Sequence, residues 1–321
     1  MLVRPQGRRR SLAGNTLAFV GISRRSVIIA SSALGAAGGM GLWALLAEAR
    51  LLPGRGVMDN ALGRCDIESA PPEAEPGTMV RASFFSAHRS RSVGYVLAFP
   101  PKITPGAALP VCLVLHGWGA SYRDPFDQVG YHRLLAGAVA AGVPPFVLAS
   151  VDGGETYWHP RADGDDPLGM LTEDFPTVLT QHGLPVDRLG VLGYSMGGYG
   201  ALAAASAAPK RFVAAVANSP AVWRSYGEAN KVNAKAFDSA EDWRRWGDLR
   251  TRTANLKGVA LRVDCGESDS FEPAISALRE QFPDPGVVHI AKGCHDNAFW
   301  RSVAPEQLKL IGTALTPPKQ T

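Results

Sequence analysis

The stretch from Arg188 to Leu202 reads RLGVLGYSMGGYGAL, and it constrains the fold of this chain more than any other segment. Its apolar first half predicts a short buried strand, and the small residues after Ser195 predict a tightly packed helix. Gly193 and Gly197 permit a sharp turn between the two, where a side chain would collide with backbone. The turn holds the Ser195 hydroxyl above the strand end, beside a helix N-terminus that favours developing negative charge. We interpret Ser195 as a nucleophile; the alternative is an ordinary Gly-Ser turn.

The composition sets the size of the core and excludes some partners. A chain of 321 residues with 46% hydrophobic residues can bury one large core. Its formal net charge of +4 is concentrated at the N-terminus, because residues 1–49 hold six arginines and one acidic residue, Glu48. The nearly neutral remainder has no basic patch for nucleic acid. No metal-ligand spacing connects the four cysteines and seven histidines, and nothing calls for an organic cofactor.

The first 49 residues resemble an export signal. The pair Arg24-Arg25 resembles the twin-arginine signal of bacterial export, and an uncharged stretch follows over residues 27–47. Ala47-Glu48-Ala49 offers a small-residue cleavage site. We predict that residues 1–49 are a twin-arginine-type signal peptide or a retained membrane anchor. In both cases the body is exported, whether secreted, periplasmic or in the cell envelope, and membrane contact is restricted to this segment.

Strand and helix patterns alternate through residues 79–321, after a linker or irregular cover at residues 50–78 that is rich in proline, glycine and acidic residues. Runs at 80–86 and 93–99 predict a hairpin at the sheet edge. Further strands are expected at 109–115, 145–151, 189–192, 212–218, 259–264 and 287–290, and helices at 131–141, 170–182, 197–207 and around Trp300. We predict an α/β fold with a mostly parallel central sheet and helices on both faces. The aromatic-rich residues 220–257 are either a small cap over the site or a unit with its own core.

His116, Gly117 and Trp118 directly follow the buried run at 109–115. A glycine-rich loop at this place supplies one half of an oxyanion hole in serine hydrolases. The backbone N–H groups of Trp118 and Met196 are then expected to converge on the substrate oxygen, and an ordinary strand-to-helix turn is the alternative. We also expect the long polar loop 155–168 to line the pocket. The candidate substrate-binding residues are His116, Gly117, Trp158, Tyr194 and Trp223.

An acidic loop and a histidine loop follow the serine, in the chain order Ser, Asp, His of α/β hydrolases. Asp269 is the predicted acid because it lies beyond a strand end; Glu267 is the reserve, and Asp264 falls within the strand. His295 is the predicted base because it lies in a loop, whereas His289 falls inside a strand. Asp269 would fix the tautomer of His295, and the other ring nitrogen would take the Ser195 proton to form an acyl-enzyme.

Two cysteines stand near these loops. Cys265 and Cys294 lie at the ends of two strands that we expect to be adjacent, which would place them close enough for a disulfide. An oxidising compartment would favour the bond. We predict a Cys265–Cys294 disulfide, and two buried thiols are the alternative. Cys112 is expected in the core, and Cys65 has no assignment.

Four motifs, LHGWGAS, GYSMGGYGAL, DCGESDSF and GCHDNAFW, resemble in order and spacing the esterase family of S-formylglutathione hydrolases, feruloyl-type esterases and mycolyltransferases. The resemblance runs from about residue 83 to the last helix. It implies an α/β-hydrolase fold, a triad of Ser195, Asp269 and His295, and oxyanion donors at Trp118 and Met196. Mycolyltransferases carry Glu as the acid, which keeps Glu267 as an alternative, and Asp at the position of His116.

These features predict an exported serine esterase that hydrolyses a small-molecule or cell-envelope carboxylic ester. The first alternative is an acyltransferase that passes the acyl group to a sugar or lipid hydroxyl. The second is a non-catalytic binding protein on the same fold. S-formylglutathione hydrolases act on a cytoplasmic thiol conjugate, which an exported protein would not meet.

Overall fold

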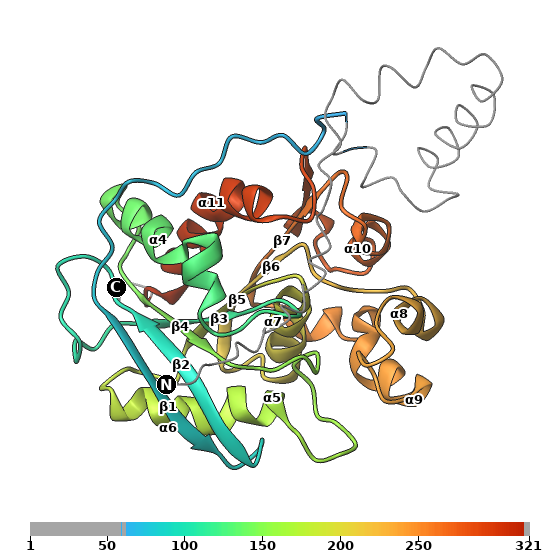
Figure 1. The fold of residues 1–321 in the computed structure, drawn as a ribbon, viewed down its shortest axis with the longest axis horizontal. Coiled ribbons are helices and arrows are strands. Elements are labelled where there is room, and N and C mark those ends of the chain that lie inside the picture. The colour runs from blue at the N-terminus through green and yellow to red at the C-terminus, as the bar shows by residue number, and fades with distance from the viewer. Residues whose placement is uncertain (1–58, 60–61, 318–321) are drawn as a thin grey trace, which may run out of the picture. The chain divides into compact units, whose positions relative to one another are not determined.

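The apolar runs form one eight-stranded sheet in the computed structural model, which describes Asp59 and residues 62–317 (Figure 1). The predicted leader, residues 1–49, lies outside the described residues. The strands are β1 (Met79–Ser86), β2 (Arg91–Ala98), β3 (Val111–Leu115), β4 (Val147–Val151), β5 (Leu189–Tyr194), β6 (Phe212–Asn218), β7 (Ala260–Gly266) and β8 (Val288–Ala291). Their order in the sheet is β1-β2-β4-β3-β5-β6-β7-β8.

The sheet is antiparallel at one edge and parallel elsewhere. β1 and β2 form the predicted hairpin, and β2 pairs antiparallel with β4. All other neighbouring strands run parallel, and β3, β4 and β5 are fully buried, as continuous apolar runs predict. The register pairs Leu115 with Gly193 and Tyr194 with Asn218. The carboxyl ends of β3, β5 and β6 therefore meet at one edge, where α/β proteins bind ligands.

Helices cover both faces of the sheet (Figure 1). They are α4 (Tyr131–Ala140), α5 (Pro167–Gly169), α6 (Phe175–Gln181), α7 (Met196–Ala207), α8 (Tyr226–Val232), α9 (Ala240–Asp242), α10 (Glu272–Arg279) and α11 (Asn297–Leu315), with short π and 3₁₀ turns at 125–129, 170–174, 243–247, 249–251, 253–256 and 285–287. α4 and α11 pack on one face, over a core that includes Val114 and Leu192. α6 and α7 pack on the other, over Leu113 and Val191. The predicted α/β class is confirmed.

Residues 220–257 pack as a small aromatic unit that contains α8 and α9. Phe237 and Trp243 are buried within it. Arg161, from the loop after β4, ties the unit to the rest of the protein through an ion pair with Asp238 at 2.6 Å. Its aromatic side chains join the core of the sheet: Phe237 packs against Tyr157 and Tyr199, with ring centroids 5.8 Å and 6.0 Å apart. The edge of the unit, at Val232 and Asn233, reaches the cavity described below.

Residues 62–78 run as an extended segment over α4 and α11 before they enter β1 (Figure 1). Arg301 of α11 donates a hydrogen bond to the backbone oxygen of Ser69 at 3.4 Å. Cys65 forms a disulfide with Cys294, with Cα atoms 5.1 Å apart. The segment is thus bonded covalently to the loop that carries His295. No helix within residues 62–317 is both long and apolar enough to cross a membrane.

The predicted Cys265–Cys294 disulfide is therefore wrong. β7 and β8 are adjacent, as expected, but their register pairs Cys265 with Ile290, and Cys294 lies in the loop beyond the end of β8. The Cys265 thiol is buried in the core and donates to the backbone oxygen of Gly266 at 3.5 Å. Cys294 instead reaches Cys65 of the extended segment, and Cys265 remains a buried thiol.

Candidate active site

Ser195 lies at the turn between β5 and α7, in a conformation that few non-glycine residues adopt. Its φ is 56° and its ψ is −120°. Such strain persists only where neighbouring structure holds it, and it is concentrated at functional sites. The Ser195 N–H donates to the backbone oxygen of Asn218 at 2.9 Å, which secures the turn against β6. A Cβ at Gly193 would meet the backbone of Gly197, and one at Gly197 would meet the backbone at the end of β3. The predicted need for both glycines is confirmed.

The structure brings Ser195, His295 and Asp269 into one hydrogen-bonded chain. His295 Nε2 lies 2.9 Å from Ser195 Oγ, and His295 Nδ1 lies 2.8 Å from Asp269 Oδ2. The Asp269 carboxylate is buried, and its other oxygen accepts the backbone N–H of Phe271 at 2.8 Å. A carboxylate only accepts, so Nδ1 carries the proton and Nε2 presents a lone pair to the serine hydroxyl. This is the arrangement a general base needs.

The alternative acid and base residues lie elsewhere. Glu267 is exposed. Asp264 is buried in β7, where it forms an ion pair with Arg262 at 2.7 Å and accepts from Gln307 Nε2 at 2.7 Å. His289 is exposed on β8, an edge strand of the sheet. Loop position, rather than residue type, therefore decided which carboxylate and which imidazole reach the serine.

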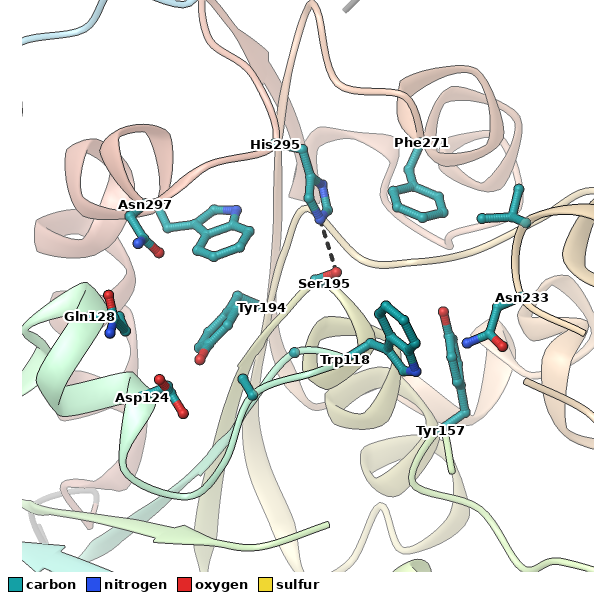
Figure 2. A pocket seen from close by; sticks show the side chains of 14 residues that line it. Trp118, Asp124, Gln128, Tyr157, Tyr194, Ser195, Asn233, Phe271, His295 and Asn297 are labelled. Carbon is teal, nitrogen blue, oxygen red and sulfur yellow. Dashed lines mark hydrogen bonds between the residues drawn. The ribbon is translucent and has the colours of Figure 1, made fainter. Parts of the chain in front are cut away.

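A cavity of about 490 Å³ opens over Ser195 and His295 (Figure 2). The residues that line it come from the loops after β3, β4, β5, β7 and β8 and from α8 and α11: Gly117, Trp118, Ala120, Asp124, Gln128, Tyr157, Tyr194, Ser195, Val232, Asn233, Phe271, His295, Asn297 and Trp300. The edge predicted from the strand order thus carries the site.

Two aromatic rings flank the His295 imidazole. The ring centroids of Phe271 and Trp300 lie 5.3 Å and 5.4 Å from that of His295. The two rings restrict the imidazole from both sides, and its side chain is 27% exposed to the cavity.

The predicted oxyanion donors lie beside Ser195. Gly117 and Trp118 line the cavity directly after β3, and the Trp118 side chain is 56% exposed. Met196 is the first residue of α7, and its side chain is buried, so only its backbone N–H can serve a ligand. The first N–H groups of a helix have no partner within the helix and face anions readily.

Of the predicted substrate-binding residues, Gly117 and Tyr194 line the cavity, whereas His116, Trp158 and Trp223 do not. His116 is fully buried: its Nε2 accepts the Gly153 N–H at 2.9 Å, and its Nδ1 lies 2.9 Å from the Gly117 oxygen. Because Nε2 accepts, Nδ1 carries the proton and donates to Gly117. The ring therefore joins the loops after β3 and β4, and it does not face the substrate.

Trp158 lies in the core beside His116, and Trp223 packs against two residues that line the cavity. Trp158 is fully buried, and its Nε1 donates to the His116 oxygen at 3.3 Å. The Trp223 ring centroid lies 5.2 Å from that of Tyr157 and 5.7 Å from that of Phe271. The expectation that loop 155–168 lines the pocket therefore holds for Tyr157 and not for Trp158.

The two tyrosines of the cavity are neutral hydrogen-bonding groups. Burial raises the pKa of Tyr194 and of Tyr157, and a hydrogen bond from Asn233 offsets only part of the rise for Tyr157. Both phenols therefore stay protonated at neutral pH. In the described part of the chain, no group of three His, Cys, Asp or Glu side chains is arranged to hold a metal ion.

Sequence reasoning missed the polar end of the cavity. Asp124, Gln128 and Asn297 line it, opposite Trp118 and Tyr157 across the serine (Figure 2). Asn297 follows His295 by two residues, and this closeness was the one available signal. Asp124 precedes, and Gln128 lies within, a π turn before α4 (Pro125–Val129) that no periodicity reveals.

The comparisons with known proteins agree with this geometry. The Esterase family model matches residues 86–284, which is more than half of the chain. An S-formylglutathione hydrolase of Paracoccus denitrificans (strain Pd 1222) is 24% identical over 246 residues, which cover 66% of this chain and 86% of that protein.

Solved structures of esterases share the fold. A ferulic acid esterase superposes with a TM-score of 0.61 at 21% identity, covering 74% of this chain and 98% of that one. An S-formylglutathione hydrolase from Agrobacterium tumefaciens gives 0.59 at 18% identity, covering 78% and 100%. The chain therefore belongs to the Esterase family and is a carboxylic ester hydrolase with an α/β-hydrolase fold.

Proposed function

We propose that this protein is an exported serine esterase that hydrolyses a carboxylic ester through Ser195, His295 and Asp269. The observation that carries the proposal is the unbroken hydrogen-bonded chain from the Asp269 carboxylate through the imidazole to the serine hydroxyl. The chain ends in a cavity large enough for a small ester.

The reaction follows from the roles of these groups. Ser195 Oγ attacks the ester carbonyl carbon while His295 Nε2 takes the hydroxyl proton. The carbonyl oxygen becomes an oxyanion that accepts hydrogen bonds from the N–H groups of Trp118 and Met196. The intermediate collapses, the C–O bond to the alcohol breaks, and His295 returns its proton to the leaving oxygen. Water then attacks the acyl-enzyme by the same route and releases the acid.

A panel of neutral esters with acyl chains of varied length tests this proposal, with wild type and Ser195→Ala compared. Loss of the nucleophile should lower kcat by about 10⁴-fold or more. Ser90→Ala, in an exposed hairpin turn, is the matched control and should retain activity. A fluorophosphonate should label Ser195 in the folded wild type. Folded protein that neither labels nor hydrolyses any ester would favour a binding protein instead.

The acyl acceptor separates an esterase from a transferase. Acyl transfer uses the same acyl-enzyme, with a sugar or lipid hydroxyl in place of water. Products should be analysed with and without a candidate acceptor alcohol. We expect free acid in both reactions, and an acylated acceptor would identify a transferase.

Two features support export. The Arg24-Arg25 pair precedes an uncharged stretch, and the Cys65–Cys294 disulfide suits an oxidising compartment. Cell fractionation of the full chain and of an Arg24→Lys, Arg25→Lys variant tests this, because the variant keeps the charge and removes the signal. Equal cytoplasmic retention of both proteins would argue against twin-arginine export.

The name of the Paracoccus denitrificans relative suggests one more compound for the panel of esters, S-formylglutathione. We expect it to be a poor substrate, because an exported protein would not meet this cytoplasmic compound.

A further inference from the structure

The cavity has a different chemistry on each side of Ser195 (Figure 2). The aromatic side chains of Trp118, Tyr157 and Phe271 form one side together with Asn233, whose Oδ1 already accepts the Lys235 N–H at 3.0 Å. The other side presents the side chains of Asp124, Gln128 and Asn297. A substrate that spans the serine therefore meets a mainly aromatic wall on one side of its ester and, beside Tyr194, a carboxylate and two amides on the other.

The polar side has acceptor oxygens that the protein does not use. Asp124 Oδ2 accepts from the N–H and the hydroxyl of Ser121, at 2.7 Å and 2.8 Å. Asp124 Oδ1 and the side-chain amides of Gln128 and Asn297 make no hydrogen bond to any described residue. Each of the three side chains thus offers one oxygen to a ligand that can donate hydrogen bonds.

Asp124 also carries a charge that no described cation neutralises. Among the lining residues, only Asp124 is formally charged at neutral pH when His295 is neutral. The nearby Arg301 guanidinium donates to the backbone oxygens of Val129, Gln128 and Ser69, at 3.0 Å, 2.5 Å and 3.4 Å. Arg123 lies over the ring of its neighbour Tyr122. Neither arginine lines the cavity.

We propose that Asp124, with Gln128 and Asn297, forms a specificity subsite that favours esters with an ammonium group and disfavours esters with a carboxylate. The subsite rests on the proposed function, because it selects among substrates for Ser195. An ammonium group has three donors and no acceptor, which matches three unpaired acceptor oxygens and one negative charge. A carboxylate at the same place meets like charge and finds no cation.

Esters of equal length that differ in terminal charge test the subsite. Ethyl heptanoate, ethyl 6-aminohexanoate and monoethyl adipate end in a methyl group, an ammonium and a carboxylate at pH 7.5. Butyrylcholine and the isosteric neutral 3,3-dimethylbutyl butyrate place the charge on the alcohol instead; the quaternary ammonium donates no hydrogen bond, so this pair tests the charge of Asp124 alone. Wild type should show a kcat/KM about tenfold higher for the cationic than for the anionic member of the acyl series, or prefer the choline ester over its neutral isostere. Added 0.5 M NaCl should shrink the preference.

Asp124→Asn should reduce the preference, measured as the ratio of kcat/KM values within the variant, to within about twofold. Asp127→Asn is the matched control: Asp127 lies in the same π turn, is exposed, pairs with Arg81 at 3.9 Å and does not line the cavity. Gln128→Lys, at an exposed position, should lower or reverse the preference even if Asp124→Asn does not fold.

The possible failures are distinguishable. Ser195-dependent hydrolysis of the neutral ester without a charge preference would overturn the subsite and leave the proposed esterase intact. An equal loss of preference in Asp127→Asn and Asp124→Asn would also overturn it, because the effect would then be a general surface charge. Absence of hydrolysis and of fluorophosphonate labelling would overturn the proposed function, and the subsite with it.

Discussion

Removal of the Cys65–Cys294 disulfide should destabilise the protein strongly. The bond closes a loop between residues separated by 229 positions. For a loop of this length the chain-entropy relation gives about 5 kcal/mol at 25 °C, and the usual measured range is about 2–5 kcal/mol. Because Ser69 is also held by Arg301, part of the extended segment stays attached without the disulfide. We therefore expect a loss of about 3–5 kcal/mol in the free energy of unfolding.

Urea unfolding of wild type and of a Cys65→Ala, Cys294→Ala double variant measures this loss. Circular dichroism and tryptophan fluorescence should give coincident transitions. A reductant should move the wild-type midpoint to that of the double variant and leave the double variant unchanged. Because Cys294 directly precedes His295, kcat on a neutral ester should fall as well. An unmoved wild-type midpoint, or peptide mapping that links Cys294 to Cys265, would refute the reasoning.

Three further predictions follow from the elements around the site. Asp269→Asn should lower kcat/KM by about 10³–10⁴-fold without unfolding the protein, because an amide does not fix the imidazole tautomer; Glu267→Gln should remain near wild type, and equal losses would reject the assignment of the acid. Gly193→Ala should cost about 3 kcal/mol in urea unfolding, because its Cβ meets backbone, and a cost below about 1 kcal/mol would contradict the tight turn. The hydrogen bond from His88 to Asp174 raises the pKa of His88 above 6.5, so its stabilisation is complete below pH 6.5 and is lost as the pH rises through the raised pKa. His88→Gln should flatten this dependence of the unfolding midpoint, and an unchanged slope would contradict it.

The strand pattern predicted the fold because the burial of a strand decides where it lies in the sheet. Continuous apolar runs such as 111–115 and 189–194 have no polar face, so they need cover on both sides and occupy the middle of a parallel sheet. The positions of Asp269 and His295 followed for the same reason, since the carboxyl ends of parallel strands meet at one edge. Residues outside this pattern, such as Asp124 at the start of a π turn, had no comparable signal.

The sequence by itself determined the elbow at Ser195, because two glycines, a strand and a helix act there over a few residues of backbone. Only the tertiary structure decided which neighbour faces the cavity and which supports it. Tyr157 and Trp158 are adjacent and both aromatic, with φ of 58° and 55°, yet Tyr157 lines the cavity and Trp158 is fully buried. The tertiary structure likewise decided that Cys294 forms its disulfide with Cys65 and not with Cys265. Such choices depend on packing between segments far apart in the chain, and no local pattern records them.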